Sequence, residues 1–170
     1  REGNIGAVKL LLGAGANTRI RNLQGDTPLN AAIQTYSMNV IQLLLDADKA
    51  AIDIPNSAGD TLLHVAIATR NIMAVQLLLR AGANINPTNQ ADNTPLYVAV
   101  LAENIDAVQI LLEGGAIPNA RNKSDITPLY MAAYNKHVEI ARLLLRYGAG
   151  IGFDFDTVPG DRAINTIFWH

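Results

Sequence analysis

The chain repeats itself at an interval of 33 or 34 residues, and this period limits its fold more than any other feature. A four-residue pattern that starts with threonine begins at Thr27, Thr61, Thr94 and Thr127. Runs of three leucines or isoleucines keep the same phase and begin at Leu10, Leu43, Leu77, Ile110 and Leu143. Gly-Ala pairs follow these runs at Gly15, Gly82, Gly115 and Gly148. Three markers in one register predict stacked units that bury their apolar surfaces against their neighbours.

The residue types within each unit predict two helices. The threonine suits the position before a first helix, where its hydroxyl can accept a hydrogen bond from an amide of the first turn. A proline follows it in three units and suits the first helical turn, where no N–H is needed. A leucine and an alanine three residues later form one apolar face, at Leu29 and Ala32, Leu63 and Ala66, Leu96 and Ala99, and Leu129 and Ala132. The apolar stripe of the second helix starts at Met38, Ile72, Ile105 and Val138.

This unit resembles the ankyrin repeat, a β-turn followed by two antiparallel helices, and the likeness covers essentially the whole chain. We therefore expect an all-α ankyrin-repeat solenoid, with projecting turns along one edge and the first helices on a concave face. The resemblance divides a single array, residues 1–170, into a partial repeat 1–21, full repeats 22–55, 56–88, 89–121 and 122–154, and a degenerate C-terminal partial repeat 155–170. Because both ends fall inside a repeat, we expect a monomeric module within a longer chain.

The sequence departs from the family pattern at three kinds of position. The glycine that the family has between its two helices is replaced by Tyr36, Arg70, Glu103 and Lys136. The glycine of the projecting turn is kept as Gly25 and Gly59 but replaced by Asp92 and Asp125, and aspartate tolerates such turns. Residues 46–50 replace the glycine that ends the second helix and include one extra residue. We expect a lengthened or distorted helix end there.

The composition argues against several classes of function. The net charge of −2 gives no reason to expect a nucleic acid or an anionic membrane as a partner. The longest apolar runs are far too short to span a bilayer, so no membrane insertion is expected. The chain has no cysteine, which excludes thiol catalysis and thiolate metal sites. We expect no enzymatic activity and no cofactor.

The remaining polar and aromatic clusters each have a structural interpretation. His64 stands where the resemblance implies a histidine that braces the turn, and His137 is expected at the solvated surface between two helices. Carboxylates gather at Asp46, Asp48 and Asp53, where we favour a solvated loop over a weak cation site. The C-terminal aromatic residues either cover the last repeat or form a ligand cage, and both interpretations stay open for Phe153, Phe155, Phe168 and Trp169.

The resemblance implies that the chain binds another protein through its turn tips and its first-helix face. At the turns this implies a binding role for Leu23, Gln24, Asp26, Ser57, Asp60, Gln90, Asn93, Lys123 and Ile126. At the ends of the first helices it implies one for Gln34, Thr35, Tyr36, Thr69, Arg70, Leu101, Glu103, Tyr134 and Asn135. At four of these positions the side chain is apolar or aromatic although the scaffold does not require it: Leu23, Leu101, Ile126 and Tyr134. Apolar and aromatic surface residues often anchor interfaces. Single apolar residues on a surface also occur without any partner.

Two other roles are compatible with the same sequence. The segment could be the targeting or regulatory arm of a larger enzyme, channel or host-directed microbial effector, whose activity lies outside these residues. It could also be a structural spacer, for which no turn-tip substitution would change any phenotype. We expect a cytoplasmic protein, with a secreted effector as the alternative.

Overall fold

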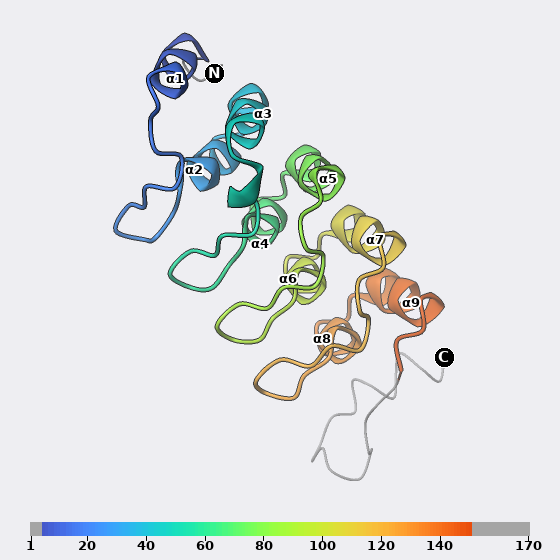
Figure 1. The fold of residues 1–170 in the computed structure, drawn as a ribbon. Helices are drawn as coiled ribbons and strands as arrows, with labels where there is room; N and C mark the ends of the chain where they lie inside the picture. Colours follow the sequence, from blue (N-terminus) through green and yellow to red (C-terminus); the bar gives the residue numbers. More distant parts are fainter. Residues whose placement is uncertain (1–4, 151–170) are drawn as a thin grey trace.

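The computed structural model of the chain describes residues 5–150, which form helices joined by loops (Figure 1). The first helices of the units are α2 (Pro28–Gln34), α4 (Leu62–Ala68), α6 (Pro95–Leu101) and α8 (Pro128–Tyr134). The second helices are α1 (Ile5–Gly13), α3 (Met38–Ala47), α5 (Ile72–Ala81), α7 (Ile105–Glu113) and α9 (Val138–Arg146). A short 3-10 helix, η1 (Lys49–Ala51), follows α3. The predicted all-α array of helix pairs is therefore confirmed for the described residues.

Each first helix begins directly after its threonine. All four threonines have extended backbone angles, as a residue before a helix requires. The hydroxyls of Thr94 and Thr127 accept hydrogen bonds from the amides of Tyr97 and Tyr130, three residues on, at 3.3 Å and 3.2 Å. A helix of seven residues is too short to be stable alone, so these helices depend on the neighbours against which they pack.

The second helices end as the glycines predict, with one exception. Gly82 ends α5 in the left-handed conformation with φ of 92°, and Gly15, Gly115 and Gly148 also have positive φ. After α3 there is no such glycine, and the chain passes through Asp48 into η1. The distorted helix end that the sequence predicts at residues 46–50 is thus confirmed.

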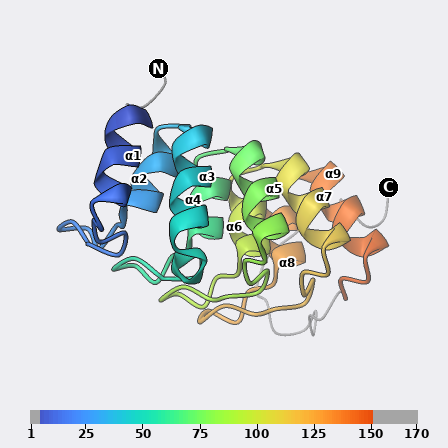
Figure 2. The same ribbon diagram turned by 45° about the horizontal axis from the view of Figure 1, so that its top comes forward.

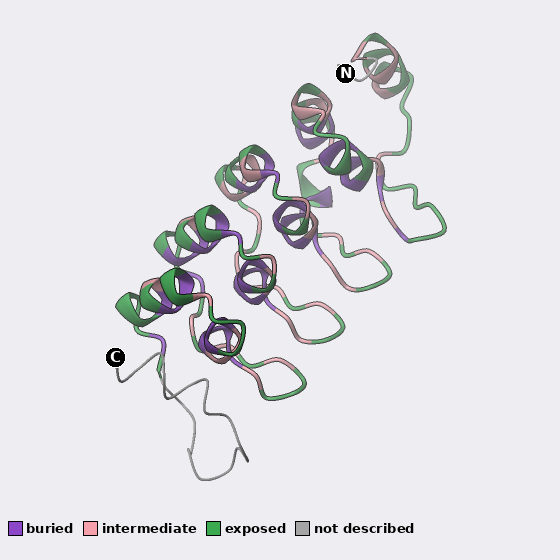
Figure 3. Ribbon diagram, turned by 180° about the vertical axis from the view of Figure 1, so that it is seen from behind, coloured by how far each residue is buried: buried purple, intermediate pink, exposed green. Residues whose placement is uncertain are grey.

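The helices form two rows that pack against each other. The first helices α2, α4, α6 and α8 lie side by side, and the second helices α1, α3, α5, α7 and α9 form the other row (Figures 1 and 2). The loops that connect the units project from one side of the stack (Figure 1). Buried residues lie where the rows meet, and the outer sides of the second helices are exposed (Figure 3).

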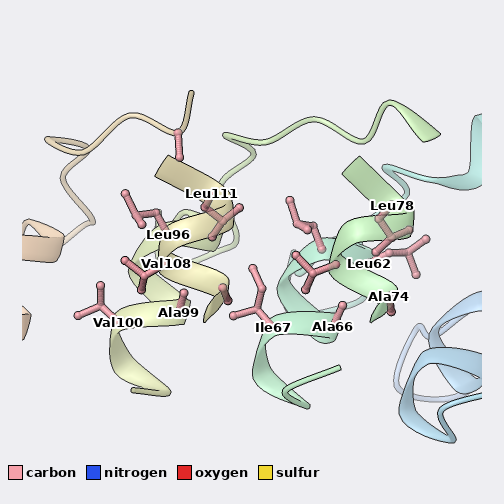
Figure 4. Packing of buried hydrophobic residues seen from close by; sticks show 14 of the residues in the cluster. Leu62, Ala66, Ile67, Ala74, Leu78, Leu96, Ala99, Val100, Val108 and Leu111 are labelled. Carbon is pink, nitrogen blue, oxygen red and sulfur yellow. The ribbon is translucent and has the colours of Figure 1, made fainter. Parts of the chain in front are cut away.

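The core runs continuously between the units because small residues let the helices approach. Ala66 and Ala99, on α4 and α6, are completely buried and belong to the same apolar cluster as Leu78 and Leu111 of the second helices (Figure 4). Each unit therefore shares its apolar surface with the next, as the periodicity predicts.

The predicted stripe of the second helix is wrong at its first position in two units. Ile105 is 44% exposed and Val138 is 40% exposed, whereas Ala107, Val108 and Leu111 are completely buried. Leu112, seven residues after Ile105 and roughly 20° from it around the helix at about 100° per residue, is only 4% exposed. The exposure of Ile105 therefore reflects its position in the first turn of α7 and not the side of the helix on which it lies.

The predicted partial repeat 155–170 and the aromatic residues Phe153, Phe155, Phe168 and Trp169 lie outside the described residues. The repeat boundaries remain a prediction.

Candidate protein-interaction surface

Each projecting turn of the described residues is held by the side chain of one asparagine. These asparagines were not among the residues predicted from the sequence. The side-chain oxygen of Asn56 accepts hydrogen bonds from the amides of Ala58 and Asp60, both at 3.0 Å. Asn22, Asn89 and Asn122 hold their own turns in the same way. These asparagines recur 34, 33 and 33 residues apart, so they could have been identified from the repeat period.

The same asparagines also join neighbouring turns. The side-chain amide of Asn89 donates to Asp60 at 2.8 Å, and that of Asn122 donates to Asn93 at 3.0 Å. Asn56 donates to Asp26 in the same way at 3.4 Å. Three residues predicted to bind a partner, Asp26, Asp60 and Asn93, are therefore half-buried and help to hold consecutive turns together.

The tips of the turns lie beyond this network and are exposed. Leu23 is fully exposed, and Gln24, Ser57, Gln90 and Lys123 are also exposed. Backbone hydrogen bonds connect the tips, since the amide of Gln90 donates to Ala58 at 3.0 Å and that of Lys123 donates to Ala91 at 3.1 Å. Ile126, the remaining predicted tip residue, is half-buried. The exposed side chains thus stand on a backbone that is fixed from turn to turn.

The outward side of the first helices, which we call the first-helix face, carries no acidic or basic side chain. Helices α2, α4, α6 and α8 contain no Asp, Glu, Lys or Arg, and their only histidine, His64, is buried. Gln34 and Thr35 are exposed at the end of α2, and Thr69 is half-buried after α4. Over α6 and α8 the exposed residues are larger, with Leu101 46% exposed, Tyr134 56% exposed and Asn135 beside it.

Tyr134 does not stand alone on this face. Its ring stacks on that of Tyr130, with centroids 6.2 Å apart and planes 11° from parallel. Val98 and Met131 are half-buried one helical turn before Leu101 and Tyr134. These three supporting residues were not predicted from the sequence, although each lies three or four positions before a predicted one, on the same side of its helix. Together they form an apolar surface over α6 and α8.

The residues between the paired helices all adopt left-handed backbone conformations. Tyr36, Arg70, Glu103 and Lys136 have φ between 50° and 60°, in place of the glycine that this conformation favours. Two of them reach the next unit, since the Tyr36 hydroxyl donates to the carbonyl oxygen of Thr69 and the Arg70 guanidinium donates to that of Ala102. Glu103 lies 3.8 Å from His137. These predicted binding residues therefore also contribute to contacts between units.

His64 has the bracing role that the resemblance implies. Its Nδ1 accepts from the Thr61 amide at 3.2 Å, which leaves Nε2–H to donate to the carbonyl oxygen of Asn93 at 3.0 Å. Burial lowers the pKa of His64 below its usual 6.5, against smaller opposing effects of Asn93 and Asp60. The residue connects the start of α4 to the next turn and is not exposed for chemistry.

The expectation that His137 is a solvated surface residue is wrong. Its side chain is only 15% exposed, because the residue directly precedes α9 and faces Glu103 of the previous unit. Its Nδ1 is buried and makes no hydrogen bond within the described structure.

The three clustered carboxylates serve separate contacts. Asp48 accepts two hydrogen bonds from the Arg19 guanidinium, at 2.5 Å and 2.8 Å, which lower its pKa to about 2. Asp46 accepts from Gln42 at 2.7 Å, and Asp53 accepts from the Asn84 amide at 3.1 Å. Between residues 5 and 150, no three potential metal ligands of the His, Cys, Asp and Glu types come together. Asp48 and Asp53 therefore make contacts outside the α-helices, whereas the expectation of a loop is wrong for Asp46, which lies in the last turn of α3 and bonds within that helix.

Comparison with protein families assigns the fold. The sequence matches the family model for ankyrin repeats (three copies) over residues 1–89 and 74–154. The chain belongs to the ankyrin repeat family. Ankyrin repeats are in general protein–protein interaction modules and are typically non-catalytic. No curated protein matched the sequence. In the part of this ankyrin array that is described, no helix is both long and apolar enough to cross a membrane.

Proposed function

We propose that this ankyrin array binds another protein, without catalysis, through its first-helix face and the tips of its turns. The observation that carries the proposal is the uncharged first-helix face with Leu101 and Tyr134 exposed on it. These two residues occupy equivalent positions on α6 and α8, which pack side by side. Large apolar and aromatic side chains on a rigid surface are the usual anchors of protein interfaces.

The chemistry of the face favours a partner segment that is apolar where it meets α6 and α8. An acidic or basic side chain buried there would meet no opposite charge on these helices and would lose its hydration. Over α2 and α4 the exposed residues are smaller and polar, as at Gln34 and Thr35, and suit the less apolar part of the segment. Charged residues lie at the edge of the first-helix face, where Arg70, Glu103 and Lys136 stand between the paired helices. Their opposite signs favour neither a strongly acidic nor a strongly basic partner.

The turn tips supply the second half of the proposed surface. Gln24, Ser57, Gln90 and Lys123 are exposed on turns whose backbones are hydrogen-bonded to one another. A surface held in this way loses little conformational freedom when a partner binds. Asp26, Asp60 and Asn93 contribute mainly by fixing the tips. The cytoplasm is our proposed location for the interaction, with a secreted effector as the alternative.

A comparative capture experiment tests this proposal. The double variant L101S/Y134S removes the two exposed anchors, and the control M73S/I105S removes two exposed apolar residues from the second helices. Both variants should keep the free energy of unfolding within about 1 kcal/mol of the wild type. We expect partner proteins captured by the wild type, quantified by mass spectrometry, to be retained by M73S/I105S and lost by L101S/Y134S.

Equal recovery by the two double variants would remove Leu101 and Tyr134 from the interface. Loss of the same partners from both variants would show that recovery reports apolar surface in general and not this face.

A further inference from the structure

A hydrogen bond between units recurs where the first helices end. The Tyr36 hydroxyl donates to the carbonyl oxygen of Thr69, the residue that caps the C-terminus of α4. One unit further on, the Arg70 guanidinium donates to the carbonyl oxygen of Ala102, the equivalent residue of α6. In both cases the donor comes from the preceding unit, so the bond closes the edge between two neighbouring first helices.

The edge between α6 and α8 breaks this pattern. The next donor position holds Glu103, whose ionised carboxylate can only accept hydrogen bonds, and the next acceptor is the carbonyl oxygen of Asn135 at the end of α8. Within residues 5–150, neither of these two acceptors receives a hydrogen bond. The Nε2 atom of His137 lies 3.8 Å from Oε2 of Glu103, beyond hydrogen-bond distance. Two acceptors therefore stand together where the other edges pair a donor with an acceptor.

Both acceptors lie beside the proposed anchors of the first-helix face. Glu103 is two residues after Leu101, Asn135 directly follows Tyr134, and all four residues are exposed. Helices α6 and α8 also pack side by side (Figure 1). A partner that covers the two anchors displaces water from the neighbouring acceptors, and an acceptor buried without a donor is costly. The partner is therefore expected to bring a donor to this edge.

We propose that the partner inserts an arginine between the Glu103 carboxylate and the Asn135 carbonyl oxygen, next to the apolar residues that contact Leu101 and Tyr134. This inference rests on the proposed function and names the chemistry of its partner. A guanidinium has five N–H donors in one plane, so it can serve a carboxylate and a carbonyl oxygen together. The array contains half of this arrangement, since the Arg70 guanidinium binds the equivalent carbonyl oxygen of Ala102.

The basic residues of the chain itself do not fill this position. The Arg70 guanidinium is bound to Ala102, and in the described part of the chain Lys136 forms no ion pair with Glu103. Arg70 and Lys136 place positive charge on the same edge in the preceding and following units. A single arginine therefore fits the edge better than a run of basic residues.

A library of random short peptides displayed on phage is a suitable probe, because it offers every combination of apolar and basic residues. Peptides are selected on the full 170-residue chain, and those whose affinity falls at least about tenfold in L101S/Y134S are kept. Their affinities for the variants are measured by fluorescence anisotropy, after thermal melts have established that each variant is folded. We expect these peptides to contain an arginine next to apolar residues. They should bind E103Q at least about fivefold more weakly than the wild type.

A double-mutant cycle assigns the contact to Glu103. Replacement of the peptide's arginine by glutamine should weaken binding to the wild type by a similar factor but should have little further effect on E103Q. The matched control is K136Q, which also removes one charge from this edge and should not weaken binding.

The outcomes separate this inference from the proposed function. Peptides that require Leu101 and Tyr134 but contain no arginine, or bind E103Q as tightly as the wild type, overturn the inference and leave the first-helix interface standing. Additive losses in the cycle also overturn it. If no selected peptide requires Leu101 and Tyr134, the inference and the proposed interface fail together.

Discussion

At the scale of single residues, His64 couples the start of one helix to the next turn through its neutral ring. Nδ1 must accept from the Thr61 amide, and Nε2–H donates to Asn93. Protonation would place an N–H against the Thr61 N–H and put a charge into a site that is 1% exposed. The pKa of folded His64 therefore lies below the value of 6.5 that it has when unfolded.

This gives a prediction on pH dependence. Below pH 6.5 the unfolded chain binds a proton at His64 that the folded chain does not, so the free energy of unfolding should fall as the pH falls from 6.5 towards the folded pKa. In H64N this contribution should vanish, because the equivalent Asn30 accepts the same hydrogen bond from Thr27 without titrating. Urea unfolding at several pH values measures both slopes. Identical slopes for H64N and the wild type would contradict the assignment.

The left-handed residues between the helices give a second prediction at this scale. Lys136 has φ of 60°, a left-handed conformation that costs a non-glycine residue about 1–2 kcal/mol in the folded state. A glycine would remove this cost, but its greater freedom in the unfolded chain would lower the free energy of unfolding by about 0.5–1 kcal/mol. We expect K136G to stabilise the array by about 0.5–1 kcal/mol, measured by urea unfolding. The control K136A removes the same side chain but keeps the strain. A K136G protein less stable than K136A would disprove this interpretation.

At the scale of the element, the projecting turn is a structural unit as much as the helices are. One asparagine per turn accepts two backbone hydrogen bonds and, from the second full unit onward, donates to the turn before it. This explains why the tips are exposed and yet fixed. It also separates predicted binding residues that are exposed at the tips, such as Lys123, from those that support the turns, such as Asp60.

The turn network can be tested with two equivalent asparagines. Both Asn22 and Asn89 hold their own turns, but Asn89 also donates to the Asp60 carboxylate at 2.8 Å. We expect N89A to lower the free energy of unfolding by about 1–2 kcal/mol more than N22A, as for a hydrogen bond to a charged group. Denaturant unfolding of both variants measures the difference. Equal losses would mean that the bond between turns adds nothing to stability.

At the scale of the whole molecule, most of the fold could be predicted from the repeat period. The interval of 33 or 34 residues predicted the helix pairs, their apolar faces and the glycines that end the second helices, because every unit must present compatible surfaces to its neighbours. The missing glycine at residues 46–50 also predicted the distorted end of α3, which η1 follows. These features are local or repeated, so the residue pattern alone determines them.

The candidate site could be predicted only in part, because exposure depends on the neighbouring unit. The exposure of Leu101 and Tyr134 is as expected for surface residues. The sequence did not indicate that Asp26 bonds to the next turn, or that Glu103 of one unit faces His137 of the next. Such contacts join residues about 30 positions apart, and no single copy of the repeat contains both partners.

The fold depends on contacts between units, and a substitution at Leu78 tests these contacts most directly. Leu78 on α5 is completely buried between neighbouring helices, whereas Met73 on the same helix is 66% exposed. The decisive measurement is the thermal unfolding of L78D and M73D, followed by circular dichroism. An unpaired charge in the core should cost more than about 4 kcal/mol, so L78D should lose most helical signal or melt at least about 10 °C below the wild type. M73D should melt within about 2 °C of it. An unchanged melting temperature for L78D would contradict the stacked arrangement on which the proposed interaction surface depends.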